Sequence, residues 1–395
     1  MHTYAIHGIS TMSEGRILTT HVGSLPRPQR VVDLLFAQDS GIGHDAPAFE
    51  TAMREEVEAV VARQVASQVD VVSDGEMSKI SYATYIRHRL TGFEIGVMPR
   101  ATPKDLDDFP EYKDRLARMG GTPKYHRPIC TGPIAVKDLS GLHEDIANLK
   151  AACAKSGAKR AFMNSASPGV IAVFQPNQHY ASQEAYLQAL ADAMQTEYET
   201  IVAAGLDLQI DAPDLGMGRH IRFRDVDEPE FLRNARLQVE ALNHALRNVP
   251  PERVRMHVCW GNYEGPHHHD IGLERIIELV LAARPATVLF EASNPRHAHE
   301  WEVWAAAARA GRIPENKILA PGVLDSVSNF IEHPRLVAQR LLQYANIVGR
   351  DRVMAATDCG FGTFAGFGAI HPPIAYAKLA SMAEGARMAS EELWG

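Results

Sequence analysis

The chain has 395 residues, of which 46% are hydrophobic and 22% are charged, so a large core is available and intrinsic disorder is excluded for most of its length. Its 40 basic and 48 acidic side chains give a net charge of −8, which argues against a general binder of nucleic acid or of acidic membranes. No apolar run approaches the roughly 20 residues that span a bilayer, so we expect a cytoplasmic protein without a membrane partner. Four cysteines in a chain of this length cannot form a disulfide scaffold, which leaves them as core thiols, metal ligands or nucleophiles.

Short apolar runs alternate with amphipathic helical stretches along the chain. The runs are rich in apolar and β-branched residues without strict alternation, which is typical of strands buried on both faces of a parallel sheet. They predict nine strands, over residues 17–22, 70–75, 127–132, 160–165, 206–211, 253–258, 287–292, 317–322 and 352–357.

The stretches between the strands predict helices. Residues 183–204 show the pattern, because Leu187, Leu190 and Met194 share one face and Gly205 follows as a stop signal. The tail over 374–393 predicts a final helix. Repeated β–α alternation over this length indicates an α/β fold of the (β/α)8 TIM barrel type. A doubly wound open sheet is the alternative, although no GxGxxG follows the first strand. Nine candidates exceed the eight strands of a barrel, so we expect one to be wrong or peripheral.

No linker or low-complexity tract divides the chain, so we expect a single catalytic barrel over residues 1–395. The polar stretch over 98–126 interrupts the β–α rhythm and predicts an excursion from that barrel. A lid and an oligomer contact are both compatible with it, which leaves the oligomeric state open.

Four side chains suited to a metal follow the predicted strands. His257 and Cys259 end one strand, Glu291 ends the next, and Cys359 ends the last. Because all strands of a parallel barrel end at the same face, these side chains could converge. One imidazole, two thiolates and one carboxylate form a plausible tetrahedral zinc set. A single cysteine at a strand end is more often a buried small hydrophobe, so core packing is the alternative.

Seven motifs resemble, in the same order, the zinc-bearing C-terminal catalytic barrel of the cobalamin-independent methionine synthase family. The resemblance runs from about residue 17 to 366 and indicates a short, single-barrel relative. It implies an S-methyltransferase that carries Zn²⁺ on His257, Cys259, Glu291 and Cys359 and methylates homocysteine to methionine. The motifs are TTHVGSLPRP (19–28), VSDGEM (72–77), LQIDAP (208–213), MHVC (256–259), FEAS (290–293), APGVLDS (320–326) and TDCG (357–360).

Zinc explains how such an enzyme would activate a thiol. A free aliphatic thiol has a pKa of ~8.5, so little thiolate exists at neutral pH, whereas coordination to zinc deprotonates it. The incoming sulfur needs a coordination position. Glu291 is the most easily displaced ligand because a carboxylate is harder than the thiolates. We therefore expect Glu291 to act in catalysis as an exchangeable ligand, bound in the resting enzyme and displaced by substrate.

The resemblance also implies roles for substrate-binding residues. Glu76 and Asp211 match carboxylates that hold the homocysteine ammonium, and Ser24 matches the loop that receives the substrate carboxylate. Asp325 falls on an acidic family position near the thiol and folate pockets, which implies a catalytic role. Helix capping or ordinary ion pairing is the alternative for Glu76 and Asp211, and loop stabilisation is the alternative for Asp325.

Three departures from the family concern the methyl donor. Phe174 stands where the family has a folate-stacking tryptophan, and Val327 stands where it has a histidine that protonates the departing folate nitrogen. Ala212 replaces a glutamate. A leaving amine needs a proton, so either another acid acts or the donor is not methylfolate. The donor therefore stays open between methylfolate and a methylated corrinoid protein.

Other functions also remain to be weighed. Epoxyalkane:coenzyme M transferases use the same zinc chemistry, but the sulfonate of coenzyme M requires arginines rather than two carboxylates. Glu76 and Asp211 therefore favour an amino-acid thiol as the substrate. Four arginines near motif ends are the reason that a thiol with an anionic tail stays an alternative. Uroporphyrinogen-type decarboxylases and a non-catalytic zinc-binding protein are the further alternatives. The four arginines are Arg27, Arg87, Arg89 and Arg296.

The run His267–His269 looks like a metal-binding tract. We expect it instead to line the entrance of the site or to cap the helix that follows Asp270.

Overall fold

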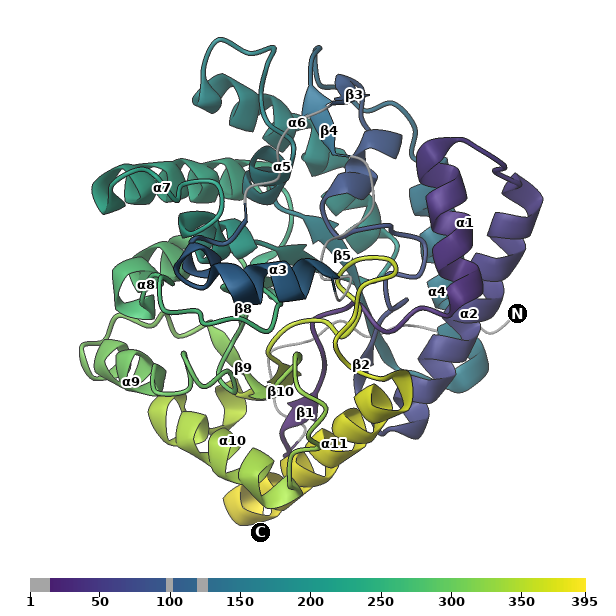
Figure 1. The fold of residues 1–395 in the computed structure, drawn as a ribbon. Coiled ribbons are helices and arrows are strands. Elements are labelled where there is room, and N and C mark those ends of the chain that lie inside the picture. The colour runs from purple at the N-terminus through teal and green to yellow at the C-terminus, as the bar shows by residue number, and fades with distance from the viewer. Residues whose placement is uncertain (1–14, 97–101, 119–126) are drawn as a thin grey trace.

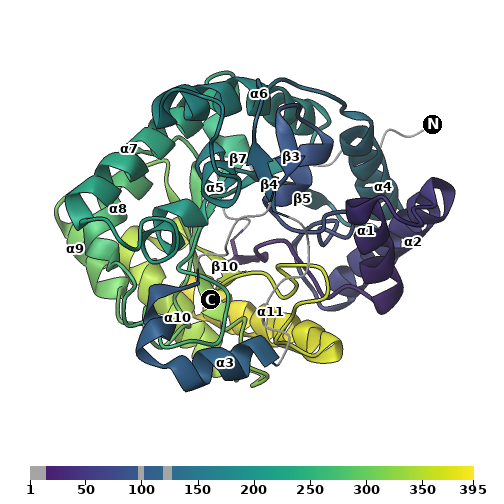
Figure 2. The same ribbon diagram turned by 45° about the horizontal axis from the view of Figure 1, so that its top comes forward.

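The computed structural model describes residues 15–96, 102–118 and 127–395. Eight strands form one parallel sheet in the order β1-β10-β9-β8-β7-β6-β5-β2, and helices surround it in both views of the fold (Figures 1 and 2). This arrangement confirms the (β/α)8 barrel. The strands are β1 (Leu18–Thr19), β2 (Val71–Val72), β5 (Arg160–Ala166), β6 (Asp207–Asp211), β7 (Val254–Val258), β8 (Thr287–Phe290), β9 (Ile318–Leu324) and β10 (Met354–Thr357).

The first two strands of the barrel are joined by hydrogen bonds at its seam. The Asp70 amide donates to the Thr19 carbonyl at 3.2 Å, and the Thr20 hydroxyl donates to the Val71 carbonyl at 3.2 Å. The sheet therefore closes on itself, which rules out the doubly wound open sheet.

The third predicted strand, over residues 127–132, is wrong as a barrel strand. Its residues form β4 (Pro128–Cys130), which pairs antiparallel with β3 (Phe93–Ile95) in a separate two-stranded sheet. The prediction was wrong because the apolar run PIC has the composition of a barrel strand, whereas composition does not determine which strand it pairs with. That pairing depends on the path of the long excursion before it. Pro128 also has no backbone N–H, so it cannot donate the hydrogen bond that a residue of a central strand gives to a neighbouring strand. The expectation that one of the nine strands is peripheral is confirmed.

The helices begin and end close to the predicted positions. The predicted helix over 183–204 is α6 (Gln183–Ala203), which starts where the Ser182 side chain accepts from the Ala185 amide. The predicted tail helix lies within α11 (Pro372–Trp394). None of the described helices is long and apolar enough to cross a membrane. The others are α1 (Gln29–Ser40), α2 (Ala46–Ala66), α3 (Pro110–Arg118), α4 (Ser140–Ser156), α5 (Pro168–Phe174), α7 (Glu228–Ala245), α8 (Leu273–Ala282), α9 (Trp301–Arg309) and α10 (Pro334–Val348), with short 3-10 helices η1 (Thr84–His88), η2 (Lys104–Asp108), η3 (Pro213–Leu215), η4 (Met217–Arg219), η5 (Pro251–Arg253) and η6 (Arg350–Arg352).

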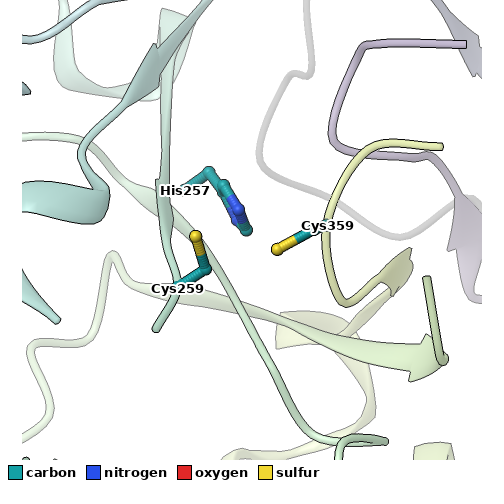
Figure 3. Close-up of side chains that lie close together, drawn as sticks. All are labelled: His257, Cys259 and Cys359. Atoms are coloured by element: carbon teal, nitrogen blue, oxygen red, sulfur yellow. The ribbon is translucent and has the colours of Figure 1, made fainter. Parts of the chain in front are cut away.

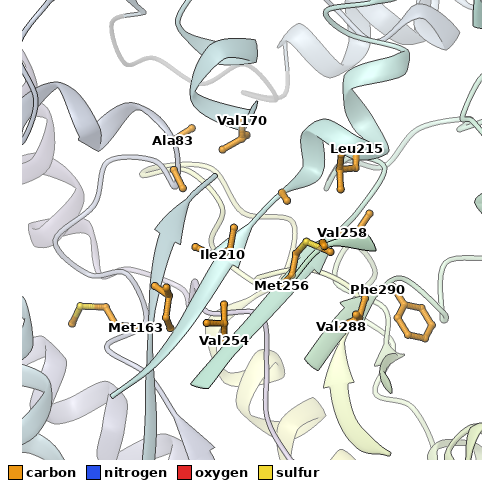
Figure 4. Packing of buried hydrophobic residues seen from close by; sticks show 14 of the residues in the cluster. Ala83, Met163, Val170, Ile210, Leu215, Val254, Met256, Val258, Val288 and Phe290 are labelled. Atoms are coloured by element: carbon orange, nitrogen blue, oxygen red, sulfur yellow. The ribbon is translucent and has the colours of Figure 1, made fainter. Parts of the chain in front are cut away.

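The main core lies between the strands and the surrounding helices. Figure 4 shows part of it, where Ile210, Met256 and Val288 of neighbouring strands pack side by side. Each such side chain contributes about 1.5–3 kcal/mol when fully buried. A second, smaller cluster fills the inside of the barrel, where the Arg255 guanidinium lies 3.9 Å from the ring centre of Phe162. The barrel is thus a packed scaffold that holds its strand ends in fixed positions.

The described part of the excursion, residues 102–118, comprises η2 and α3, and we call it the excursion segment. Figure 1 shows α3 crossing in front of β8. The Lys104 amide donates to the His220 carbonyl at 3.0 Å, and the Tyr112 hydroxyl donates to the Glu264 carbonyl at 2.5 Å. These contacts place the excursion segment on the loops that follow β6 and β7. Residues 98–101 and 119–126 of the predicted excursion lie outside the described residues.

Candidate active site

Three predicted metal ligands converge at the carboxyl ends of β7 and β10. His257 and Cys259 are two residues apart, so an extended backbone directs both side chains to the same face. Cys359 follows β10 and points toward them (Figure 3). The ligand atoms of the three residues all lie within 4.8 Å of one another, and the side chains are only 3–6% exposed. We call these residues the metal trio.

The chemistry of the metal trio fits a soft divalent cation. The buried His257 Nδ1 has no hydrogen-bond partner among the described residues, and the Leu289 backbone accepts a hydrogen bond from the ring. Burial and the Arg255 charge lower the pKa of His257 to about 3, so its imidazole is neutral and keeps a lone pair. Burial and the neighbouring Cys259 raise the pKa of Cys359. Two thiolates this close would repel each other, and a bound zinc ion would offset that repulsion.

Glu291, the predicted fourth ligand, lies beside the metal trio. Its Oε1 is 3.9 Å from the Cys359 sulfur, and burial raises the pKa of its carboxyl group. Oε1 accepts a hydrogen bond from the Trp260 amide at 2.7 Å, and Oε2 accepts one from the Asn294 side chain at 2.8 Å. The carboxylate is therefore satisfied by the protein in a position next to the ligand atoms.

A buried aspartate that sequence reasoning missed connects these two parts of the site. Asp358 precedes Cys359, and its Oδ1 accepts from the Ala292 and Ser293 amides at 2.8 and 2.9 Å. Its Oδ2 accepts from the Asn294 amide at 2.7 Å. These bonds fix the loop after β8 against the end of β10. The TDCG motif contains this residue, but only the loop conformation gives it three amide donors.

A cavity of about 800 Å³ opens beside the metal trio. Four other predicted site residues line it, so the structure brings together seven of the nine in one place. Glu291 is not among the lining residues. Asp325 is also outside the lining, and its Oδ1 accepts from the Val327 amide at 3.0 Å, which fits the loop-stabilising alternative. The four predicted residues in the lining are Ser24, Glu76, Phe174 and Asp211.

Two of these residues form a buried pair of carboxylates. Glu76 is 1% exposed and Asp211 4% exposed. Burial, together with the charge of Asp211, raises the pKa of Glu76, and burial raises that of Asp211. Asp211 accepts hydrogen bonds from the Asn164 and Gln209 side chains, both at 3.0 Å, whereas Glu76 Oε2 has no partner among the described residues. The unpaired oxygen of Glu76, beside a second carboxyl group in the cavity wall, suits a cationic amine.

Ser24 lies on the turn after β1, where it meets the loop after β10. The Phe361 amide donates to the Ser24 carbonyl at 2.8 Å. A side chain at Gly360 would place its Cβ 1.9 Å from the Ser24 hydroxyl, so any larger residue would force that hydroxyl to move. The close approach of the two loops fixes Ser24 on the cavity wall, near the metal trio.

Aromatic side chains form another part of the cavity wall. Tyr82 packs against Phe174 and Phe364, with ring centres 5.6 Å apart in each pair. Val327 also lines the cavity. Sequence reasoning identified Phe174 but missed Tyr82 and Phe364. The run of glycines and phenylalanines over 361–368 was the available signal for Phe364.

The four arginines that were candidate partners for an anionic substrate make other contacts in the structure. Arg27 donates to the backbone of Glu76 and Gly362, and Arg87 pairs with Asp39. Arg89 pairs with Asp145 and Glu197, and Arg296 donates to the His268 carbonyl at 3.4 Å. Among the described lining residues, the lysines and arginines are Lys113 and Arg127.

The histidine run divides into a buried and an exposed part. His267 is buried, and its Nδ1 lies 2.7 Å from Asp270 Oδ2. His297 Nε2 lies 2.9 Å from the same oxygen, and its ring stacks on Trp260 at 4.0 Å. Against the effect of burial, hydrogen bonds to Asp270 and Glu300 raise the pKa of His297 to about 10. His268 and His269 are exposed.

Comparisons with known proteins agree with the motif-based resemblance. The family described as "Cobalamin-independent synthase, Catalytic domain" matches residues 17–98. A methionine synthase of Saccharolobus islandicus is 26% identical over 378 residues, which cover 95% of each chain. Those of Saccharolobus solfataricus and Sulfolobus acidocaldarius are 25% and 23% identical, over 95% of this chain and 95% and 93% of theirs.

Two solved structures share the fold over nearly their whole length. A B12-independent methionine synthase from Shewanella sp. W3-18-1, in complex with selenomethionine, has a TM-score of 0.72 at 18% identity and covers 96% of this chain and 99% of its own. A putative vitamin-B12-independent methionine synthase from Listeria monocytogenes has a TM-score of 0.64 at 17% identity, with the same coverage. The resemblance to the cobalamin-independent methionine synthase family is thus confirmed.

Proposed function

Starting from this resemblance, we propose that the chain is a zinc-dependent S-methyltransferase that transfers a methyl group to homocysteine and releases methionine. One observation carries the proposal: the metal trio and the carboxylate pair of Glu76 and Asp211 line the same cavity. A thiol and an ammonium on one small molecule could therefore be bound together. The curated relatives carry the name methionine synthase, which agrees with this chemistry.

The metal trio would hold the zinc ion, and Glu291 would be the exchangeable fourth ligand. Bound zinc would lower the pKa of the substrate thiol and so provide a nucleophilic sulfur at neutral pH. His257 contributes a neutral imidazole whose orientation is fixed by the Leu289 carbonyl. Glu291 has hydrogen-bond donors for both oxygens when it is not a ligand.

The remaining lining residues would bind and orient the amino acid. Glu76 and Asp211 would hold the ammonium, and the turn that carries Ser24 would receive the carboxylate. These contacts fix the position of the sulfur relative to the methyl donor, which converts an encounter in solution into a reaction between aligned groups. Asp325 would act through the loop it stabilises.

The methyl donor would occupy the aromatic side of the cavity. Tyr82, Phe174 and Phe364 offer ring faces and edges on which a flat donor could pack. Val327 cannot protonate a leaving group, so a folate donor would need another acid, and Glu264 and Asp114 both line the cavity. A methylated corrinoid protein needs no such proton and remains a donor of equal standing.

The engagement of Arg27, Arg87 and Arg89 weakens the case for coenzyme M as the acceptor, which leaves Lys113 and Arg127 as the cations of the described cavity wall that its sulfonate could meet. We also propose that residues 1–395 act as one catalytic unit in the cytoplasm.

The test is a matrix of acceptors and donors. The zinc-loaded protein is incubated with homocysteine or coenzyme M and with methylfolate, methylcobalamin or an epoxide. Methionine formation from homocysteine with one methyl donor is the expected result. Zinc-loaded protein that alkylates only coenzyme M would replace this function by the epoxide-opening one, and protein that neither binds zinc nor turns over would remove both.

A further inference from the structure

A second group of metal-ligand side chains lies on the surface, away from the metal trio. Asp108 ends η2 in the excursion segment, and His268 and His269 lie in the loop between β7 and α8. One ligand atom from each of these residues lies within 4.8 Å of the other two. The three side chains are 36–51% exposed, so an ion in solution can reach them. We call these residues the surface trio.

Both imidazoles of the surface trio meet one carboxylate oxygen, and a further separation of about half an ångström would admit an ion at Zn–N and Zn–O distances of about 2.0–2.2 Å. His268 Nε2 lies 2.8 Å and His269 Nε2 2.7 Å from the same oxygen, Asp108 Oδ2. The two imidazole rings are 4.2 Å apart at their centres and inclined by 36°. Their polar edges therefore face the same carboxylate from neighbouring positions. Two imidazoles and one carboxylate, with a water in the fourth position, are a frequent ligand set for zinc.

The surface trio joins two segments that are far apart in sequence. Asp108 is 160 residues from His268, and neighbouring contacts fix both segments at this place. The Tyr263 hydroxyl and the His267 amide donate to Asp105 Oδ2 at 2.5 and 2.8 Å. The ligand positions are therefore preorganised by buried neighbours and do not depend on the exposed side chains alone.

We propose that the surface trio is a second divalent-cation site, selective for an ion that prefers imidazole, such as Zn²⁺, over Mg²⁺. The ion takes the place of the hydrogens that the two Nε2 atoms donate to Asp108, and each imidazole then carries its hydrogen on Nδ1. Oxygen-preferring Mg²⁺ finds only one carboxylate here and binds poorly.

Binding at this site would fasten the excursion segment to the loop that leaves β7. Thr102, Leu106 and Lys113 of the excursion segment line the cavity, as do Tyr263 and Glu264 of the loop. A bridge between the two would hold this part of the cavity wall in place. The surface trio shares no residue with the metal trio, so the two sites can be removed separately.

The test is isothermal titration of the full chain with Zn²⁺, after removal of bound metal by a chelator. The wild type is expected to bind two equivalents, and the H268A/H269A variant one. The C259S/C359S variant is expected to keep the equivalent that H268A/H269A loses. An H143A/H299A variant removes two exposed imidazoles elsewhere on the surface and serves as the matched control, with two equivalents retained. Mg²⁺ in place of Zn²⁺ should give no heat that depends on His268 and His269.

A second measurement is the rate of tryptic cleavage within residues 102–118, which contain Lys104, Lys113, Arg115 and Arg118. Zn²⁺ should slow this cleavage in the wild type and in C259S/C359S, but not in H268A/H269A. If H268A/H269A binds as many equivalents as the wild type, the surface trio is only a hydrogen-bonded contact and the proposal is overturned. If instead C259S/C359S binds as many as the wild type, the metal trio fails as the catalytic site while the surface site stands.

Discussion

Replacement of Asp211 by asparagine tests whether the carboxylate pair holds the amine of the substrate. The change removes one negative charge and leaves the shape of the side chain nearly unchanged. Asp211 is 4% exposed, so its interaction with an ammonium is little screened by water. A hydrogen bond to a charged group contributes about 1.5–3 kcal/mol. At 1.4 kcal/mol for each factor of ten, we expect the KM for homocysteine to rise by about 10- to 150-fold.

The assay compares homocysteine with 4-mercaptobutyrate, which is the same thiol without the amine. Asn164 and Gln209 both donate to Asp211, so the asparagine variant also disturbs their hydrogen bonds. A disturbance of that kind would raise the KM for both thiols, whereas loss of an ammonium contact raises only that for homocysteine. Equal increases for the two thiols would refute the reasoning and favour an acceptor without an amine.

Other changes test the remaining parts of the site. Cys259→Ser should abolish both stoichiometric zinc binding by the metal trio and methionine formation. Cys153→Ser changes a buried thiol outside the site and should keep both. Retention of zinc and activity in Cys259→Ser would contradict the ligand assignment. Burial and the Asp211 charge raise the pKa of Glu76 to about 8. Because a carboxyl group is charged and attracts a cation only above its pKa, the affinity for methionine, measured by calorimetry, should increase from pH 6 to pH 8. Glu76→Gln should flatten that profile, and an unchanged slope would exclude Glu76 as its source. Asp358→Asn weakens three amide contacts of the loop after β8 and should lower zinc affinity about 10- to 100-fold, as read from competition with a chelator. Unchanged affinity would show that this loop does not position the ligands.

The sequence predicted the barrel because its signals are local. Apolar runs such as the one over 287–292 indicate burial on both faces, and their alternation with helices leaves few topologies. The run over 127–132 carries the same local signal, yet its pairing with β3 depends on the path of the intervening chain. No pattern within six residues contains that information.

The site divides in the same way. His257 and Cys259 are two residues apart, so their shared face follows from strand geometry, and Cys359 joins them because parallel strands end together. Asp358 and Asp325 could not be ranked from sequence. Each follows a barrel strand in a short loop, but the loop conformation gives Asp358 three amide donors and turns Asp325 toward Val327.

The hydrogen bonds of Glu291 bear on how a ligand could be exchanged in a buried site. A buried carboxylate that leaves a cation without finding new partners is costly, because its charge has lost both water and counter-ion. Here the Trp260 amide and the Asn294 side chain donate to its two oxygens, and Trp260 follows Cys259 directly in the chain. The loop that carries Cys259 therefore also provides a hydrogen-bond donor to the Glu291 carboxylate. If zinc binds at the metal trio as proposed, these two donors would offset the loss of the cation when Glu291 is displaced, which is what an exchangeable ligand requires.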